Sequence, residues 1–193
     1  HYENMHSAIL AEFLNPKGSH GLKGRFLEAF VNQLTLPDSF NDFNCDNAKV
    51  KTEAPSENGR IDIFIYDNNG RALIIENKIY AGDQWEQLKR YDHFANQKCG
   101  KLNYRIFYLT PMGSAPSENS GGGVDYTQIS YADDIIKWLE RCVNLSARFP
   151  LVRETIIQYI NHLNKLTNQD MDKINQDELV KILSKPENIE SAI

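Results

Sequence analysis

The sequence lacks the long apolar runs and leader patterns that mark membrane and secreted proteins. No apolar run approaches the roughly 18 residues that a membrane-spanning helix needs. The first residues show no signal-peptide pattern. The chain begins at His1 rather than Met, which leaves room for an upstream segment of the same protein. We therefore expect a protein with no membrane association.

Cysteine is scarce. The chain holds three, Cys45, Cys99 and Cys142, which are widely spaced and form no Cys-x-x-Cys pair. Disulfide frameworks need an even set of cysteines, and structural zinc sites need closely spaced ones. We therefore expect reduced thiols in a cytoplasmic protein.

An excess of positive charge is also missing. The chain has 21 Lys and Arg against 26 Asp and Glu, for a formal net charge of −5. This balance argues against a protein that coats nucleic acid through bulk charge. It does not exclude an enzyme with a local basic rim, because acidic metal sites themselves lower the net charge. At 193 residues the chain fits one domain, or one domain with an extension.

Residues 58–79, NGRIDIFIYDNNGRALIIENKI, read as one β-hairpin. Two apolar runs flank a strong turn signal, and a three-residue loop, 68–70, closes the ladder between Asp67 and Arg71. Gly70 takes the left-handed position of that loop. Because side chains alternate along a strand, one face of the hairpin then carries core residues, namely Ile61, Ile63, Ile65, Leu73 and Ile75.

The same register brings acidic residues together on the other face. Asp62 falls opposite Glu76, with Cβ atoms about 5 Å apart, and Lys78 shares their face. Like charges at that distance repel each other, so a hard divalent cation, helped by the neighbouring lysine, would stabilise them. The alternative is a cross-strand salt bridge between Lys78 and Glu76 on a half-exposed face, which is common and weakly stabilising.

The rest of the chain predicts helices and strands around this hairpin. Periodicity predicts helices over residues 5–15, 22–36, 84–96, 130–142 and 150–166, and strands over 49–55, 104–110 and 126–129. Residues 111–123 contain Pro, Ser and four Gly, and we expect a long loop that is mobile or functional. The order of elements predicts an α/β fold with a mixed central β-sheet flanked by helices.

The last part of the chain differs in composition. From Gln169 onward it is acid-rich and weakly helical, with Pro186 interrupting the pattern. We therefore expect a main domain over residues 1–168. A helical C-terminal extension over residues 169–193 would follow it and could continue past the last residue.

Two polar residues follow the hairpin on the next predicted helix. Gln87 and Tyr91 are four residues apart, so they point the same way, and the helix begins soon enough after Lys78 to fold back beside it. On their own, an exposed Gln87 and a Tyr91 that packs against its helix neighbours would be the plainer interpretation.

Together, an Asp on one strand, Glu-x-Lys on the next and Gln-x-x-x-Tyr on the following helix resemble the PD-(D/E)XK nuclease superfamily, in its RecB-like branch. The wider chain is similar to one bacterial family within it, over roughly residues 4–142. The stretches that carry the likeness are NMHSAILAEFLNPKGSHG, GRIDIFIYD, IIENKIYAGDQWEQLKRY, YRIFYLTPMG and ISYADDIIKWLERC. The residue before Asp62 is Ile61 rather than the Pro of the superfamily name, a frequent departure. The resemblance implies a restriction-endonuclease-like core.

The resemblance also implies roles for single residues. Asp62 and Glu76 would bind Mg²⁺ or Mn²⁺, with the backbone carbonyl of Asn77 as a further ligand. Lys78 would orient or deprotonate the attacking water. The implied protein is a metal-dependent deoxyribonuclease that hydrolyses phosphodiester bonds of DNA.

The chain offers further candidate residues for the site. Gln87 and Tyr91 would line the site and hold the phosphate or the nearby backbone. Glu53, on the preceding strand, is a candidate ligand or base, and an exposed strand Glu is the alternative. His20 is a candidate additional ligand from the N-terminal motif, and a histidine that caps or packs at a helix start is its alternative.

The substrate groove and the function class stay open at this point. Lys89 and Arg90 follow the site in sequence and are candidates for nucleic-acid binding, although scattered surface cations occur in any soluble protein. Two other functions compete with the deoxyribonuclease. One is a non-catalytic nucleic-acid- or protein-binding module that retains the nuclease fold. The other is a phosphodiesterase that acts on RNA or a nucleotide.

Overall fold

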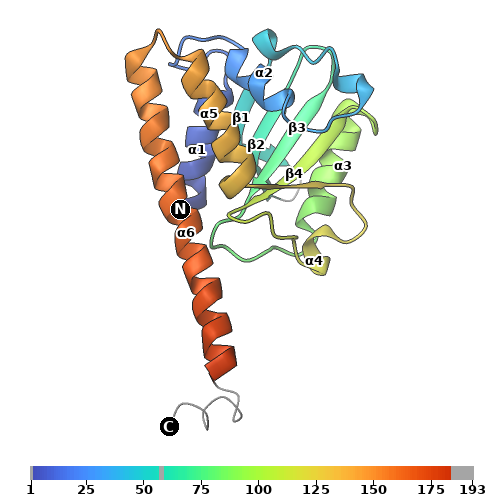
Figure 1. Cartoon of the computed structure of the whole chain (residues 1–193). Helices are drawn as coiled ribbons and strands as arrows, with labels where there is room; N and C mark the ends of the chain where they lie inside the picture. The colour runs from blue at the N-terminus through green and yellow to red at the C-terminus, as the bar shows by residue number, and fades with distance from the viewer. Residues whose placement is uncertain (1, 57–58, 184–193) are drawn as a thin grey trace.

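The computed structural model describes residues 2–56 and 59–183, with side chains to residue 167 (Figure 1). The strands are β1 (Lys49–Ser56), β2 (Gly59–Tyr66), β3 (Ala72–Asn77), β4 (Tyr104–Thr110) and β5 (Thr127–Ser130). The helices are α1 (Tyr2–Leu14), α2 (Arg25–Val31), α3 (Gln87–Cys99), α4 (Glu118–Gly121), α5 (Ile136–Leu145) and α6 (Pro150–Leu183). Single helical turns lie at η1 (Asp38–Phe40), η2 (Cys45–Asn47) and η3 (Tyr131–Ile135).

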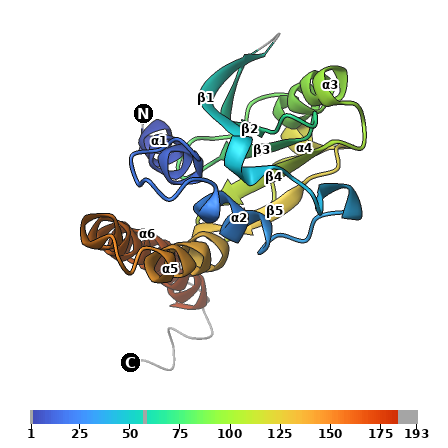
Figure 2. The same cartoon turned by 90° about the horizontal axis from the view of Figure 1, so that it is seen from above.

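The strands form one five-stranded sheet in the order β1-β2-β3-β4-β5. The pairs β1–β2 and β2–β3 are antiparallel, whereas β3–β4 and β4–β5 are parallel. Helices α1, α2, α5 and α6 lie on one face of the sheet, and α3 lies on the other (Figure 2). The predicted α/β fold with a mixed sheet flanked by helices is therefore confirmed.

Both faces of the sheet are buried. Ile63, Ile65, Leu73 and Ile75 join the core under α1, α2, α5 and α6, as the hairpin pattern predicts. Ile61 is equally buried but packs in the cluster on the α3 side of the sheet. The prediction that it shares a core face with Ile63 and Ile65 was therefore wrong. The β2–β3 pairing ends at Ile63, and Ile61 instead pairs with Ala54 of β1, which belongs to the same α3-side cluster.

The predicted hairpin turn is confirmed. Gly70 has a φ of 79°, and the Asp67 N–H donates to the Arg71 carbonyl over 3.0 Å. The register runs from Tyr66↔Ala72 to Ile63↔Ile75. Asp62 and Glu76 are the next residues after its last pair, on the side away from the turn. A buried ion pair secures the turn, with Arg71 Nε 3.1 Å from Asp67 Oδ2.

Arg71 also joins the turn to the loop before the sheet. Its guanidinium donates to the carbonyl of Ser39 over 2.7 Å and pairs with the carboxylate of Asp42. Asp67 meanwhile accepts the N–H of Asn44 over 3.2 Å. The turn that fixes the hairpin register is thus held from outside the hairpin.

Several predicted boundaries move. The second helix covers only Arg25–Val31, and not residues 22–36, because Leu36 precedes a proline and Gly24 lies against the backbone of Cys45 and Asp46. In the predicted loop 111–123, residues Glu118–Gly121 form α4.

The C-terminal part is helical, as expected, since α6 continues to Leu183. The predicted boundary at residue 168 falls inside this helix and stays a prediction. Pro186 lies outside the described residues. Within the described part of the chain, no helix is both long and apolar enough to cross a membrane. All three cysteines carry free thiols, as predicted.

We expect Arg71→Ala to lower the free energy of unfolding by about 3 kcal/mol, because it leaves the buried Asp67 carboxylate without its cation. Urea denaturation at neutral pH measures this. Arg148→Ala, at an exposed position, is the matched control. Equal stabilities of the two variants would show that the ion pair does not hold the turn.

Candidate active site

The structure brings the charged residues of the hairpin together at one cavity of about 340 Å³. Asp62 comes from β2, Glu76 from β3, and Lys78 from the residues just after β3. Gln87, the first residue of α3, also lines the cavity. The remaining lining residues are Glu3, Asn4, Glu53, Gly59, Arg60, Ala81 and Gln84.

Glu76 is fully buried and held by three side chains. Lys78 Nζ lies 2.8 Å from its Oε1, and Gln87 Nε2 donates to the same oxygen over 2.7 Å. The Tyr91 hydroxyl donates to Glu76 Oε2 over 2.7 Å. Both carboxylate oxygens are therefore fixed, and α3 supplies two of the three contacts.

Gln87 and Tyr91 are buried, so the interpretation of Gln87 as an exposed surface residue was wrong. Their side chains touch each other, with Gln87 Nε2 3.2 Å from the Tyr91 oxygen. The Tyr91 oxygen also lies 2.6 Å from the Arg60 carbonyl, which belongs to the strand that carries Asp62. These two residues thus connect the strands of the two carboxylates.

Asp62 faces the same cavity. Its Oδ2 accepts the Asn77 N–H over 2.8 Å. Burial, and then the neighbouring Glu76 carboxylate, raise the pKa of Asp62 to about 7. Burial also raises the pKa of Glu76, while Lys78 opposes that rise. Ionising both groups therefore costs free energy that a bound cation would offset.

The donor set suits a hard divalent cation. Mg²⁺ usually takes one or two carboxylates and keeps several waters, and the cavity offers Asp62 and Glu76 with room for water. Within residues 2–56 and 59–167, no group of three or more His, Cys, Asp or Glu is arranged to hold a metal ion. A structural zinc site, which needs four such ligands, therefore does not fit, whereas Mg²⁺ or Mn²⁺ does.

Asn77 links the site to the N-terminal helix. Its Nδ2 donates to the Glu3 carbonyl over 3.1 Å and to Ser7 Oγ over 3.0 Å. Its Oδ1 accepts the Tyr131 hydroxyl over 2.9 Å. The side chain is thus anchored to α1 and η3. Sequence reasoning missed these partners, because nothing in their spacing marks them.

The structure brings Glu53 to the cavity but not His20. Glu53 lies opposite Asp62 in the β1–β2 register, with a φ of 51°, and its carboxylate is 3.2 Å from Arg60 Nη1. His20 instead fastens the α1–α2 connection. Its Nε2 lies 2.9 Å from the Asn15 carbonyl, and its Nδ1 accepts the Leu22 N–H.

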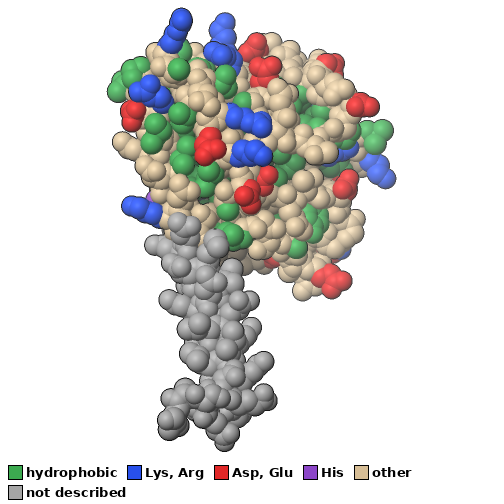
Figure 3. Space-filling model, viewed as in Figure 1, with side chains coloured by type: hydrophobic (Ala, Val, Ile, Leu, Met, Phe, Trp, Pro, Cys, Tyr) green, Lys and Arg blue, Asp and Glu red, His purple; other side chains and the backbone are tan. Residues whose placement is uncertain are grey.

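Lys89 and Arg90 do not line the cavity. Lys89 pairs with Glu86 over 3.0 Å, and Arg90 binds the Trp85 carbonyl and the side chain of Gln84. The exposed cation at the cavity is Arg60, which sequence reasoning missed. On the face drawn in Figure 3, basic and acidic side chains are interspersed.

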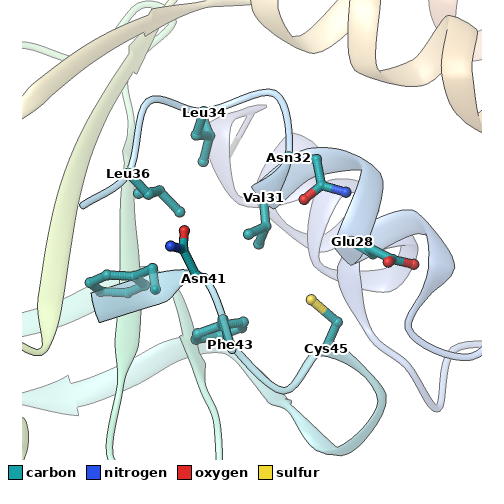
Figure 4. Close-up of a pocket in the computed structure, with 9 residues that line it drawn as sticks. Glu28, Val31, Asn32, Leu34, Leu36, Asn41, Phe43 and Cys45 are labelled. Carbon is teal, nitrogen blue, oxygen red and sulfur yellow. The ribbon is translucent and has the colours of Figure 1, made fainter. Parts of the chain in front are cut away.

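A second cavity, of about 300 Å³, lies beside α2 (Figure 4). Its lining residues are Glu28, Val31, Asn32, Leu34, Leu36, Phe40, Asn41, Phe43 and Cys45. Burial, with a smaller effect of Glu28, raises the pKa of the Cys45 thiol to about 12, so the reactive thiolate is disfavoured. This cavity has neither paired carboxylates nor an activated nucleophile, so the Asp62 cavity is the better candidate.

The raised pKa of Asp62 predicts a pH-dependent stability without divalent metal. The folded protein holds a proton that the unfolded chain has lost above about pH 4, so the free energy of unfolding falls as the pH rises toward 7. Asp62→Asn removes this effect and should be more stable than wild type at pH 8 by about 1–3 kcal/mol. Below pH 4 the two should converge.

Urea denaturation in EDTA across this pH range tests the effect, with Asp125→Asn, at an exposed position, as the control. If the wild type and Asp62→Asn show the same pH dependence, the carboxylate is not perturbed as described.

Comparisons with known proteins identify the family of the chain. Curated proteins give no match. The crystal structure of a repair endonuclease from Pyrococcus abyssi is similar over 44% of this chain and 39% of that chain, at 19% identity. Its TM-score of 0.30 is too low to establish a common fold. The profile of the PD-(D/E)XK nuclease superfamily matches residues 1–161, which is most of the chain. The chain therefore belongs to the PD-(D/E)XK nuclease superfamily.

Proposed function

We propose that this chain is a divalent-metal-dependent nuclease that hydrolyses phosphodiester bonds of DNA in the Asp62 cavity. The observation that carries the proposal is the buried Glu76 carboxylate, held by Lys78, Gln87 and Tyr91 beside Asp62. A carboxylate pair with this burial is unfavourable in a purely structural role. Membership of the nuclease superfamily supports the same function.

In this proposal Asp62, Glu76 and the backbone carbonyl of Asn77 would hold Mg²⁺ or Mn²⁺. When bound, the cation lowers the pKa of a coordinated water and neutralises charge on the scissile phosphate. Lys78 positions the attacking water and adds positive charge where the transition state becomes more negative. The water oxygen forms a bond to phosphorus and loses a proton, while one ester P–O bond breaks and the departing oxygen gains a proton, which leaves a phosphate monoester end and a hydroxyl end.

The other residues act by positioning. Gln87 and Tyr91 orient Glu76, and Tyr91 also holds the backbone of Arg60. Glu53 lines the cavity and is the candidate for a further metal ligand or base.

A non-catalytic binding module is the second candidate. One observation favours it: Lys78 already balances the charge of Glu76, so this carboxylate is stabilised without a cation. Metal binding separates the two candidates.

Single replacement of Asp62, Glu76 or Lys78 with Ala should reduce DNA cleavage by about 100-fold or more, because each removes charge that acts in the transition state. Cleavage of linear, circular and single-stranded DNA with Mg²⁺ or Mn²⁺ measures this. Lys137→Ala, at an exposed position of α5, is the control. If wild type cuts and all three variants cut equally well, the site assignment is wrong.

Calorimetric titration with Mn²⁺ should show binding to wild type that disappears in Glu76→Ala, because that change removes one of the two proposed carboxylate ligands. Glu140→Ala, at an exposed position of α5, should bind as wild type does. DNA binding without any Mn²⁺ binding, even when DNA is present, would favour the binding module.

A further inference from the structure

The segment between β3 and α3 carries two exposed aromatic rings. This segment, residues 78–86, is the β3–α3 loop. Trp85 is 67% exposed and Tyr80 is 59% exposed. The other tryptophan, Trp138, is fully buried and bonded to the Phe26 carbonyl, as a structural tryptophan is expected to be. The Trp85 ring therefore contributes little to the packing of the core.

The two rings lie close in the chain to residues of the candidate active site. Ala81 and Gln84 line the cavity, and they lie between Tyr80 and Trp85 in the chain. In Figure 1 the loop runs below the sheet, from the start of α1 toward α4. Its backbone is bonded to α1 near its first residues and to α4 at its last residue. Tyr80 and Trp85 do not line the cavity themselves, but each is the chain neighbour of a residue that does.

The first part of the loop is fixed by α1. The carboxylate of Glu3 accepts the N–H groups of Tyr80 and Ala81 over 2.7 and 2.8 Å. The Tyr80 ring lies against the ring of Tyr2, with centroids 5.3 Å apart.

The second part is fixed by three more elements. Asp83 accepts the Tyr108 hydroxyl and the Ser117 N–H, each over 2.6 Å, and so does not cap α3. The N–H of Glu86 donates to the Asn119 carbonyl, while Arg90 holds the Trp85 carbonyl. The exposed rings are therefore presented by a pre-organised backbone, which lowers the entropy lost on binding.

The charge of the cavity limits which ligand these rings suit. Among its described lining residues the cations are Arg60, paired with Glu53, and Lys78, paired with Glu76. Four carboxylates, those of Glu3, Glu53, Asp62 and Glu76, face them. Attraction of phosphates is therefore weak here, and stacking of a base on an aromatic ring, worth about 1–3 kcal/mol per base, is the larger source of affinity.

We propose that Tyr80 and Trp85 stack with unpaired nucleobases, so that the nuclease acts on single-stranded DNA or on single-stranded ends and gaps of a duplex. In paired DNA the base faces are covered by neighbouring bases and are not open to these rings. Arg60, whose side chain is 72% exposed, lies at the same cavity and would leave its partner Glu53 to bind the adjacent phosphate. The proposal rests on the proposed nuclease function.

The test measures binding apart from cleavage. Wild type, with Ca²⁺ in place of Mg²⁺, is titrated with fluorescein-labelled oligothymidylate and with a blunt duplex of the same length. Anisotropy should show at least about tenfold tighter binding of the single strand. Tryptophan fluorescence should fall on binding, because Trp85 is exposed and Trp138 is buried.

The variants assign the effect to the rings. Trp85→Ala and Tyr80→Ala should each weaken binding of oligothymidylate by about tenfold, whereas Trp85→Phe keeps a ring and should retain most of it. Phe149→Ala, at an exposed aromatic outside the loop, is the matched control. Thermal unfolding checks that the variants are folded.

Equal or tighter binding of the duplex, or unchanged binding by both alanine variants, would overturn the inference. In that case Mn²⁺ binding and duplex cleavage by wild type would leave the proposed nuclease function intact. If wild type neither binds Mn²⁺ nor cleaves DNA, but still binds oligothymidylate through the two rings, only the proposed nuclease function would be overturned.

Discussion

The burial of the Glu76 carboxylate beside Asp62 is the constraint on which the site depends. A buried carboxylate is stable only when its oxygens are bonded or its charge is balanced. Here Lys78, Gln87 and Tyr91 supply the bonds, but none of them contacts the neighbouring Asp62 with a comparable hydrogen bond. Burial, and then the Glu76 carboxylate, raise the pKa of Asp62, and the pair suits a divalent cation.

The surrounding elements serve to keep this arrangement in place. On one side of β3, α3 places the donors to Glu76. On the other side, α1 and η3 hold the Asn77 side chain, which leaves the Asn77 N–H directed at Asp62. The ion pair of Arg71 and Asp67 fixes the far end of the same hairpin. Side chains alternate between the two faces of an extended strand. Glu76 and Lys78 are two residues apart, so they share the face that opens on the cavity.

The sequence predicts the hairpin register and the pairing of Gln87 with Tyr91, because both follow from local periodicity. It does not predict contacts that depend on the packing of distant segments. Glu3 reaches the end of β3 across more than seventy residues of chain. Asp83 looks like a helix cap, yet it bonds to Tyr108, while Glu86 begins α3 with a left-handed φ of 50°. Left-handed φ values at glutamate have no sequence signature, so the start of α3 was misplaced.

The most direct test is the unfolding of wild-type protein at pH 8 in urea as Mn²⁺ is added. If the cation offsets the repulsion between Asp62 and Glu76, the free energy of unfolding rises with the logarithm of Mn²⁺ concentration above its dissociation constant. The same titration should leave Asp62→Asn nearly unchanged. A wild-type stability that does not respond to Mn²⁺, or an equal response of Asp62→Asn, would contradict this account.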